Sequence, residues 1–346
     1  MSGKYLALDG CLRKLKRSSP RDSAPPEGQT QYAVRCTTDN RSSSGYVRVL
    51  GMPQTLPSGR CNSPLGPPAG LSGLPPVGVS VAVHQSGPRR LLGADSPHPA
   101  WPTFQGGAVL VGASRGMVSV YVDRALGDQA VVNATDLLAD ADRIVADNNA
   151  VFAIVGGPVS VLVCGLSGAT DGSGGADHGG CDFMSGGAIE VCAAFGNSIL
   201  VGALFEAELA ECAMNGALCG SSTGEALSRW CAAEICQNAI ASWATAPAWV
   251  AAGMPNWVDH TFQSDMHEPS VGCAMAFISW LRSQGFTLGT IAQRMVALGD
   301  DGTLAQLHAA VMGAPAYGTW QEFECAVAEL PDGVSDDDPF FVLRSR

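Results

Sequence analysis

The residues best suited to chemistry are glutamates that recur on two consecutive predicted helices. Glu208 and Glu211 are three residues apart on a helix predicted over residues 199–214, so their carboxylates share one face. Glu225 opens the next predicted helix, over residues 224–236, and would approach that face if the two helices packed as a hairpin. Grouped carboxylates can transfer protons and can hold a metal ion. The sequence therefore predicts an acidic site shared by two helices.

A second candidate is the segment 220–224, which satisfies the G-x-S-x-G motif of serine hydrolases. In this interpretation Ser222 is the nucleophile. The base is His267 or His308, and the acid is Asp259 or Asp265. The residues before the motif lack the strand pattern that such a site requires. The alternative is that Ser222 caps the next helix, with Glu225 as its capping-box partner.

A third candidate is the segment 256–269, a polar loop between predicted helices. It concentrates acids, histidines and an aromatic residue: Trp257, Asp259, His260, Asp265, His267 and Glu268. Loops of this kind often line functional sites, and His260 and His267 have the chemistry of a metal ligand or a general base. The alternative is a solvated loop.

The elements that must position these residues form a strand-rich part followed by a helical part. Strands are predicted over residues 117–123, 158–164 and 188–195, and an amphipathic helix capped by Asn133 connects the first two. Further helices are predicted over residues 239–252, 271–284, 288–298, 303–312 and 320–329. The predicted fold is α+β, with a small mixed sheet and a crossover helix followed by a mainly helical half, in one domain over residues 106–346.

The chain before that domain has a different composition. Residues 1–60 hold 10 basic and 4 acidic residues (+6), whereas the other 286 residues hold 10 basic and 28 acidic (−18), which together give −12. We expect residues 1–105, which are basic and rich in Pro, Ser and Gly, to form a largely disordered head. The apolar run after Lys4 is short and Asp9 interrupts it, so we expect no signal peptide at this start.

Charge and composition exclude several classes of function. A net charge of −12 argues against a nucleic-acid partner, and no apolar run reaches the roughly 20 residues that span a bilayer. The glycine-rich segment 165–180 lacks the G-x-x-x-x-G-K-[ST] motif, and no lysine follows Lys16, which excludes a P-loop nucleotide site. The expected partner is a small-molecule or peptide substrate.

Nine of the twelve cysteines lie in the predicted domain and form no CxxC pair, so we expect no structural zinc. Three pairs have spacings that would suit local disulfides: Cys181 with Cys192, Cys212 with Cys219, and Cys231 with Cys236. The last pair is five residues apart on a predicted helix, which is a poor spacing for a bridge between the two. The alternative is that several are small buried hydrophobic residues. If disulfides form, the protein works in an oxidising compartment, as a secreted or periplasmic protein.

The region 117–343 resembles the gluzincin metallopeptidases. Residues 207–211, Ala-Glu-Leu-Ala-Glu, stand where the family has its HExxH motif, and residues 224–227 look like the family's N-E-G-x segment. Residues 271–281 look like the later helix that backs the site, and the order strand, helix, strand, edge strand, motif helix and Glu helix is similar to theirs. The region is also similar to uncharacterised bacterial proteins.

The resemblance implies that Glu208 is the general base and that Glu211 and Glu225 occupy ligand positions. Both motif histidines are replaced, by Ala207 and Glu211. A site built mainly from carboxylates, together with His178 or another loop ligand, suits Ca²⁺ or Mn²⁺ better than Zn²⁺. We therefore expect a divalent metal as cofactor and no nucleotide.

The expected function is a hydrolase that acts on a peptide or ester bond, as a divergent metallopeptidase-like protein. In it Glu208 would activate a water held near Glu211 and Glu225. One alternative is an esterase with Ser222 as nucleophile. Another is a binding or scaffold protein without catalysis, in which the glutamates are a solvated acidic face.

Overall fold

The computed structural model describes residues 5–8, 11–17, 29–38, 41–50, 95–114, 117–313 and 315–341 of the chain. The first four of these ranges are the strands β1 (Tyr5–Leu8), β2 (Cys11–Arg17), β3 (Gln29–Thr38) and β4 (Arg41–Leu50). They pair antiparallel in the order β1-β2-β3-β4, within a unit of their own, Met1–Pro64. All the candidate site residues belong to the second unit, Leu65–Arg346.

The predicted disordered head, residues 1–105, lies largely outside the described residues. Inside that range the structure has strands β1 to β4, and residues 95–105 contribute to the core of the second unit. Trp101 is buried there, and the backbone N–H groups of Thr103 and Phe104 donate to the carboxylate of Glu190. Packing therefore begins before the expected boundary at residue 106.

The second unit is built on a five-stranded mixed sheet with the order β5-β6-β7-β9-β8. Its strands are β5 (Ala108–Ala113), β6 (Val118–Asp123), β7 (Val159–Cys164), β8 (Ala176–His178) and β9 (Ala188–Cys192). β6, β7 and β9 are parallel and central, whereas β5 and β8 are antiparallel edge strands. The central strands are rich in Val and Ile and almost wholly buried, as expected for strands covered on both faces. The predicted α+β class is confirmed.

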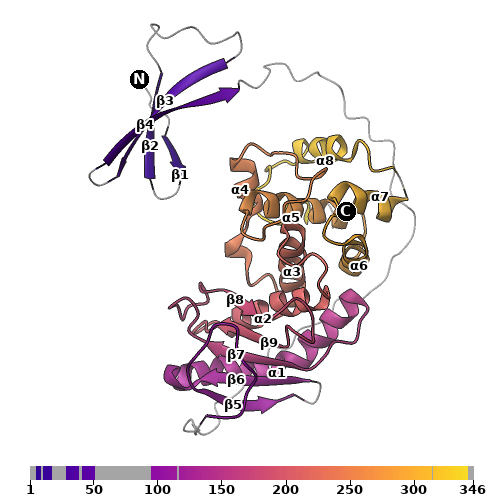
Figure 1. Ribbon diagram of the computed structural model, residues 1–346. Coiled ribbons are helices and arrows are strands. Elements are labelled where there is room, and N and C mark those ends of the chain that lie inside the picture. Colours follow the sequence, from indigo (N-terminus) through magenta and orange to yellow (C-terminus); the bar gives the residue numbers. More distant parts are fainter. Residues whose placement is uncertain are drawn as a thin grey trace. The chain divides into compact units, whose positions relative to one another are not determined.

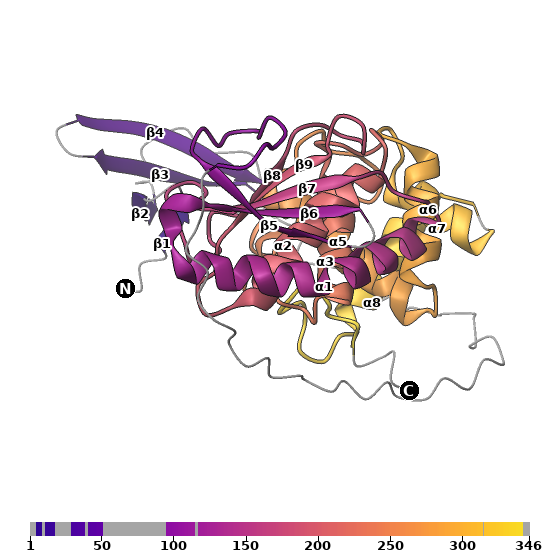
Figure 2. The ribbon, with the colours of Figure 1, turned by 90° about the horizontal axis from the view of Figure 1, so that it is seen from below.

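The crossover helix α1 (Asp128–Phe152) connects β6 to β7 and runs along the sheet (Figures 1 and 2). Its start was predicted at Asn133, but the helix begins five residues earlier. Asn133 is buried inside it and donates to the Ala194 carbonyl and to the Ser198 hydroxyl. An Asn that fits the capping pattern is thus used as an anchor between α1 and the start of the next helix.

The remaining described helices are α2 (Ser198–Ala213), α3 (Ser222–Ile235), α4 (Ala246–Ala251), α5 (Glu268–Ser283), α6 (Leu288–Leu298), α7 (Leu304–Met312) and α8 (Thr319–Ala328). α2 packs on α1 and on β8 and β9, while α4 to α8 form a second core around α5 (Figure 1). The helix predicted over residues 239–252 is wrong. Its place is taken by a 3₁₀ helix, Ala241–Trp243, and the short α4, because Pro247 fits only the first turn of a helix.

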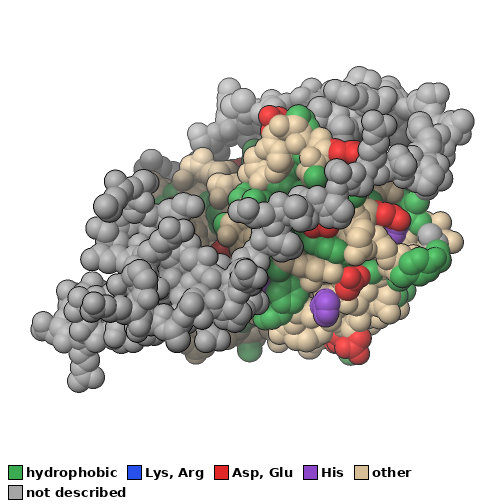
Figure 3. Space-filling model, turned by 90° about the horizontal axis from the view of Figure 1, so that it is seen from above, with side chains coloured by type: hydrophobic (Ala, Val, Ile, Leu, Met, Phe, Trp, Pro, Cys, Tyr) green, Lys and Arg blue, Asp and Glu red, His purple; other side chains and the backbone are tan. Residues whose placement is uncertain are grey.

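One face of the molecule carries acidic side chains (Figure 3). The coloured side chains in Figure 3 include Asp, Glu and His, and none of them in that view is Lys or Arg. Among the described residues no helix is long and apolar enough to cross a membrane. The three consecutive aspartates at residues 336–338 are partly bound by the fold. Asp337 accepts hydrogen bonds from the N–H groups of Thr245 and Ala246, and Asp338 accepts one from the hydroxyl of Ser279.

Candidate functional site

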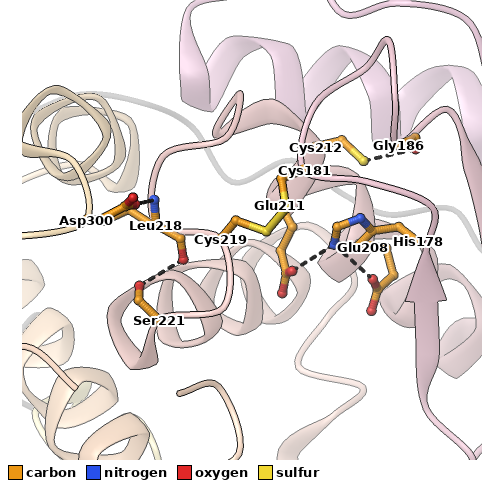
Figure 4. The surroundings of a disulfide bond; sticks show 10 residues. All are labelled: His178, Cys181, Gly186, Glu208, Glu211, Cys212, Leu218, Cys219, Ser221 and Asp300. Carbon is orange, nitrogen blue, oxygen red and sulfur yellow. Dashed lines mark hydrogen bonds and ion pairs between the residues drawn. A yellow bond between two sulfur atoms is a disulfide. The ribbon is translucent and has the colours of Figure 1, made fainter. Parts of the chain in front are cut away.

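His178, Glu208 and Glu211 come together between the edge strand β8 and the helix α2 (Figure 4). Nε2 of His178 lies 3.0 Å from Oε2 of Glu211 and 3.8 Å from Oε2 of Glu208. Each of the three residues offers one ligand atom, and these atoms lie within 4.8 Å of one another. The structure thus joins three of the residues that the sequence analysis selected.

The local sequence explains this meeting. β8 pairs antiparallel with β9 so that His178 stands opposite Ile189, at the end of the ladder. α2 begins shortly after β9, where the side chain of Asn197 accepts a hydrogen bond from the N–H of Leu200 and caps the helix. Because α2 then packs on both β8 and β9, its polar face meets the last residue of the edge strand.

The electrostatics of the group favour a cation. Burial raises the pKa of Glu208 well above its ordinary value, and the negative charges of Glu211 and Glu225 raise it further. Asp177 and Asp265 act in the same direction. The site therefore gathers more negative charge than one imidazole can balance, and a bound cation would relieve that repulsion.

The imidazole of His178 is suited to carry a positive charge or to bind a metal ion. Burial lowers the pKa of the ring, but the hydrogen bond to Glu211 and that carboxylate's charge raise it more, so the net pKa lies above the ordinary value. Nδ1 is buried and has no hydrogen-bond partner among the described residues. Nε2 is the nitrogen that lies near the carboxylates of Glu208 and Glu211, so it is the atom that could bind a cation.

Glu225 lies beside the group and is already paired. Its Oε1 accepts a hydrogen bond of 2.6 Å from Nε of Arg229, whose Nη1 also donates to the Trp243 carbonyl. Burial raises the pKa of Glu225 in spite of the opposing charge of Arg229. The carboxylate of Glu225, which was expected to be a metal ligand, is thus paired with an arginine of the same helix.

Two residues at the site, Ser228 and Arg229, were not predicted from the sequence. The hydroxyl of Ser228 lies 3.3 Å from Oε1 of Glu211 and donates to the Glu225 carbonyl. Arg229 was detectable, because it follows Glu225 at the i,i+4 spacing of helical ion pairs. No sequence signal marks Ser228, since a serine in a helix is usually solvated.

The G-x-S-x-G segment has no serine-hydrolase geometry. α2 and a turn precede it, and the cap of α3 is Ser221, whose hydroxyl accepts from the N–H of Gly224. Ser222 is a buried first-turn residue and Glu225 does not complete a capping box, because its carboxylate faces Arg229. In the described part of the chain no hydrogen bond connects Ser222 to His267.

The loop over residues 256–269 lies beside the acidic group. The carbonyl of Phe262 accepts the N–H of Ser222, and Asp265 contributes to the raised pKa of Glu208. His267 caps α5 by accepting the N–H of Ser270, and its ring stacks on Phe262 with ring centres 4.3 Å apart. The ring of His267 is therefore engaged in holding the loop on α5.

The other residues considered from sequence have separate roles. The side chain of Asp259 accepts a hydrogen bond from Asn256, and His260 is exposed. His308 is buried on α7, where it stacks on Trp280 and contacts the hydroxyl of Thr319. Among the described residues none of these joins the group at His178.

A disulfide connects the segments on either side of the group. Cys181 is bonded to Cys219 with a Cα–Cα distance of 5.9 Å, whereas the predicted local pairs are wrong (Figure 4). The remaining partners in those predictions are buried thiols: Cys192, Cys212, Cys231 and Cys236. Spacing along the chain failed because β8 and the α2–α3 turn are neighbours only in the folded protein.

The donor set fits a divalent cation. One imidazole nitrogen and two carboxylate oxygens converge, and excess negative charge surrounds them. The same set can transfer protons, because the partly buried carboxylate of Glu211 lies within hydrogen-bond distance of the imidazole. Comparisons of the chain with protein-family models, with curated proteins and with solved structures find no match.

Proposed function

We propose that the chain is a metal-dependent hydrolase of a metallopeptidase-like type, which acts on a peptide or ester bond. The observation that carries the proposal is the convergence of ligand atoms from His178, Glu208 and Glu211 within 4.8 Å. His178 and Glu211, which are 3.0 Å apart, are the ligands in this proposal. Glu208 completes the group as the acid–base residue.

The mixed donor set selects among metals. Ca²⁺ takes six to eight oxygen ligands, and structural Zn²⁺ prefers Cys and His. One imidazole with carboxylates instead suits a first-row ion such as Mn²⁺, which accepts both donor types. When bound, such an ion supplies polarisation of a carbonyl and a lowered pKa for water.

Glu208 is suited to accept a proton. Its burial and its carboxylate neighbours raise its pKa, so the protonated form is accessible nearer neutral pH than for an exposed glutamate. Arg229 forms an ion pair with Glu225 and so offsets its negative charge, and the hydroxyl of Ser228 donates to the carboxylate of Glu211. The chain's own residues thus divide into a proton acceptor, two cation ligands and their supports.

The order of elements also supports the proposal. The crossover helix α1 between β6 and β7 and the helices α2 and α3 after the sheet agree with the order of a gluzincin-like scaffold, whereas the strand directly before α2 is the central β9 and not the expected edge strand. The departure from that family lies in the donors, because Ala207 and Glu211 replace the paired histidines of the motif. We therefore propose the scaffold together with a different metal preference.

The test measures hydrolysis by wild-type protein and by two variants. Metal-free protein, prepared with a chelator, is assayed on p-nitrophenyl esters and on a peptide mixture with and without Mn²⁺. Glu208→Gln is expected to bind Mn²⁺ and to lose roughly a hundredfold or more in kcat. Glu211→Gln is expected to weaken Mn²⁺ binding by about tenfold or more. Glu324→Gln, an exposed change on α8, is the matched control.

The outcomes separate the proposals. Hydrolysis that requires Mn²⁺ and Glu208 supports the metal-dependent hydrolase. Activity that resists chelation and survives Glu208→Gln contradicts it. Mn²⁺ binding without hydrolysis of either substrate class favours the alternative of a cation-binding protein without catalysis.

A further inference from the structure

The Cys181–Cys219 disulfide ties together the two segments that carry the proposed site. Cys181 follows His178 by three residues, and Cys219 lies in the turn between α2 and α3, which carry Glu211 and Glu225 (Figure 4). The bond closes a loop with a sequence separation of 38 residues. The imidazole ligand His178 thus lies just before one end of this loop, and the carboxylate ligand Glu211 lies inside it, eight residues before the other end.

The remaining connections of the His178 segment are few. β8 has three residues and pairs only with β9 among the described strands. Beyond it, the Gly179 N–H donates to the Ala188 carbonyl, the Cys181 carbonyl accepts the N–H of Gly216, and the Gly186 carbonyl accepts the thiol of Cys212 at 3.1 Å. The side chain of Phe183 is partly buried against the core. Edge segments with few backbone bonds open at a lower free energy than core strands, so the covalent tether has a large share in holding His178 against α2.

We propose that the Cys181–Cys219 disulfide sets the cation affinity of the His178 site. Reduction of this bond frees the segment that carries His178 and weakens cation binding. The inference rests on the proposed function, whose regulation it describes. In the reduction, a dithiol donates two electrons and two protons to the S–S bond. Two protein thiols form, and the dithiol becomes its cyclic disulfide.

The physical reason is the cost of assembling the donors. Glu208 and Glu211 carry like charge and gain nothing from meeting each other, so the group forms only where the fold imposes it. With the tether intact, the fold has already restricted His178, and a cation binds a formed set. After reduction, cation binding must order the β8 segment as well, which weakens the apparent affinity.

The inference predicts in which kind of compartment the site binds a cation. Disulfides persist in oxidising compartments and are reduced in the cytosol. A site whose affinity depends on this bond would be loaded with a cation after export and would be weak in a reducing environment.

The experiment compares Mn²⁺ affinity in the oxidised full-length protein, in protein reduced by dithiothreitol and then freed of reductant, and in the double variant Cys181→Ser/Cys219→Ser. Cys325 is also disulfide-bonded, so reduction of the wild type alone would break that bond as well as the Cys181–Cys219 bond. Reducing the double variant therefore serves as the control. Circular dichroism confirms that each form is folded.

A second readout does not use metal. The thiol of Cys212 is buried and donates to Gly186 in the tethered loop, so release of the loop exposes it to alkylation. Peptide mapping after a short pulse of iodoacetamide gives its rate. The buried thiol of Cys273 in the second core is the internal reference for global unfolding.

We expect the double variant and the reduced protein to bind Mn²⁺ about tenfold or more weakly than the oxidised protein, with Cys212 alkylated faster and Cys273 unchanged. Reduction of the double variant should change neither readout. Equal Mn²⁺ affinity in the tethered and untethered forms contradicts the inference and leaves the metal site intact. Failure of the oxidised protein to bind Mn²⁺ overturns the proposed function, and the inference with it. An unchanged Cys212 rate contradicts the loop release itself.

Discussion

Nε2 of His178 lies 3.0 Å from Oε2 of Glu211, although 33 residues separate them in sequence. The contact spans two kinds of element, because His178 ends an edge strand and Glu211 lies on the helix beneath it. Its length is that of an ordinary N–H···O hydrogen bond. A carboxylate and an imidazole held in this way by the fold can share a proton or a cation, and the predictions below test how they are held.

Ser228→Ala should weaken the support of Glu211. The Ser228 hydroxyl lies 3.3 Å from Oε1 of Glu211 and also donates to a carbonyl one turn back. We expect about a tenfold loss of Mn²⁺ affinity, measured by titration calorimetry, and a fall of about 1 kcal/mol in the free energy of unfolding. Ser283→Ala removes the same type of hydroxyl-to-carbonyl bond away from the site and is the control. Equal Mn²⁺ affinities of the two variants would show that Ser228 does not act through Glu211.

Arg229→Met should destabilise the protein by leaving a carboxylate unpaired. The pair with Glu225 is about four-fifths buried, and its Nε–Oε1 distance is 2.6 Å. We expect the free energy of unfolding in urea to fall by about 2 kcal/mol or more. The double variant Arg229→Met/Glu225→Met should recover much of this loss, because the unpaired charge is gone. A double variant as unstable as the sum of the single variants would contradict the pairing.

Glu190→Gln should loosen the segment 95–105. The Glu190 carboxylate is fully buried and accepts from both the N–H and the hydroxyl of Thr103 and from the N–H of Phe104. A Gln side chain presents an NH₂ group to at least one of these donors. We expect a loss of about 2 kcal/mol in the free energy of unfolding and faster cleavage within residues 95–105 by a protease. Cleavage at the wild-type rate would mean that the segment is held elsewhere.

Stability should fall in mild acid because of His308. Burial lowers the pKa of this ring, and the charge of Glu322 at 3.9 Å opposes the shift without cancelling it. The unfolded chain therefore takes up a proton on His308 at a higher pH than the folded chain does. The stabilising contribution is complete above the unfolded pKa of about 6.5 and is lost as the pH falls through the lower folded pKa.

The check uses urea unfolding between pH 7.5 and pH 5. His308→Asn should show a smaller decrease in the free energy of unfolding over this range than the wild type. His260→Asn, which removes an exposed histidine, is the control and should keep the wild-type slope. Parallel slopes for wild type and His308→Asn would contradict the assignment.

Much of the fold was predictable because its elements have clear periodic patterns. The helix predicted over residues 288–298 is α6 (Leu288–Leu298) itself, and the strand predicted over 158–164 differs from β7 by one residue. β8 escaped prediction, since three residues in a glycine-rich segment have no period to detect. Its existence depends on pairing with β9, which is a tertiary property.

The site was predictable in its residues and less so in its pairings. Glu208 and Glu211 follow from their spacing on one helix, and His178 came from the resemblance to metallopeptidases. The ion pair that occupies Glu225 needed a comparison of acids and bases within one helix. The Cys181–Cys219 bond could not be found from spacing, because its partners are brought together by the packing of β8 on α2.

The most direct test of the account is titration of the oxidised, metal-free protein with Mn²⁺, followed by calorimetry and by the electron paramagnetic resonance of free Mn²⁺. The wild type should bind one Mn²⁺ per chain, and His178→Ala should bind it about tenfold or more weakly. His260→Ala, at an exposed histidine, should match the wild type. Absence of stoichiometric binding by the wild type, or equal affinity in His178→Ala, would contradict a cation site at His178, Glu208 and Glu211.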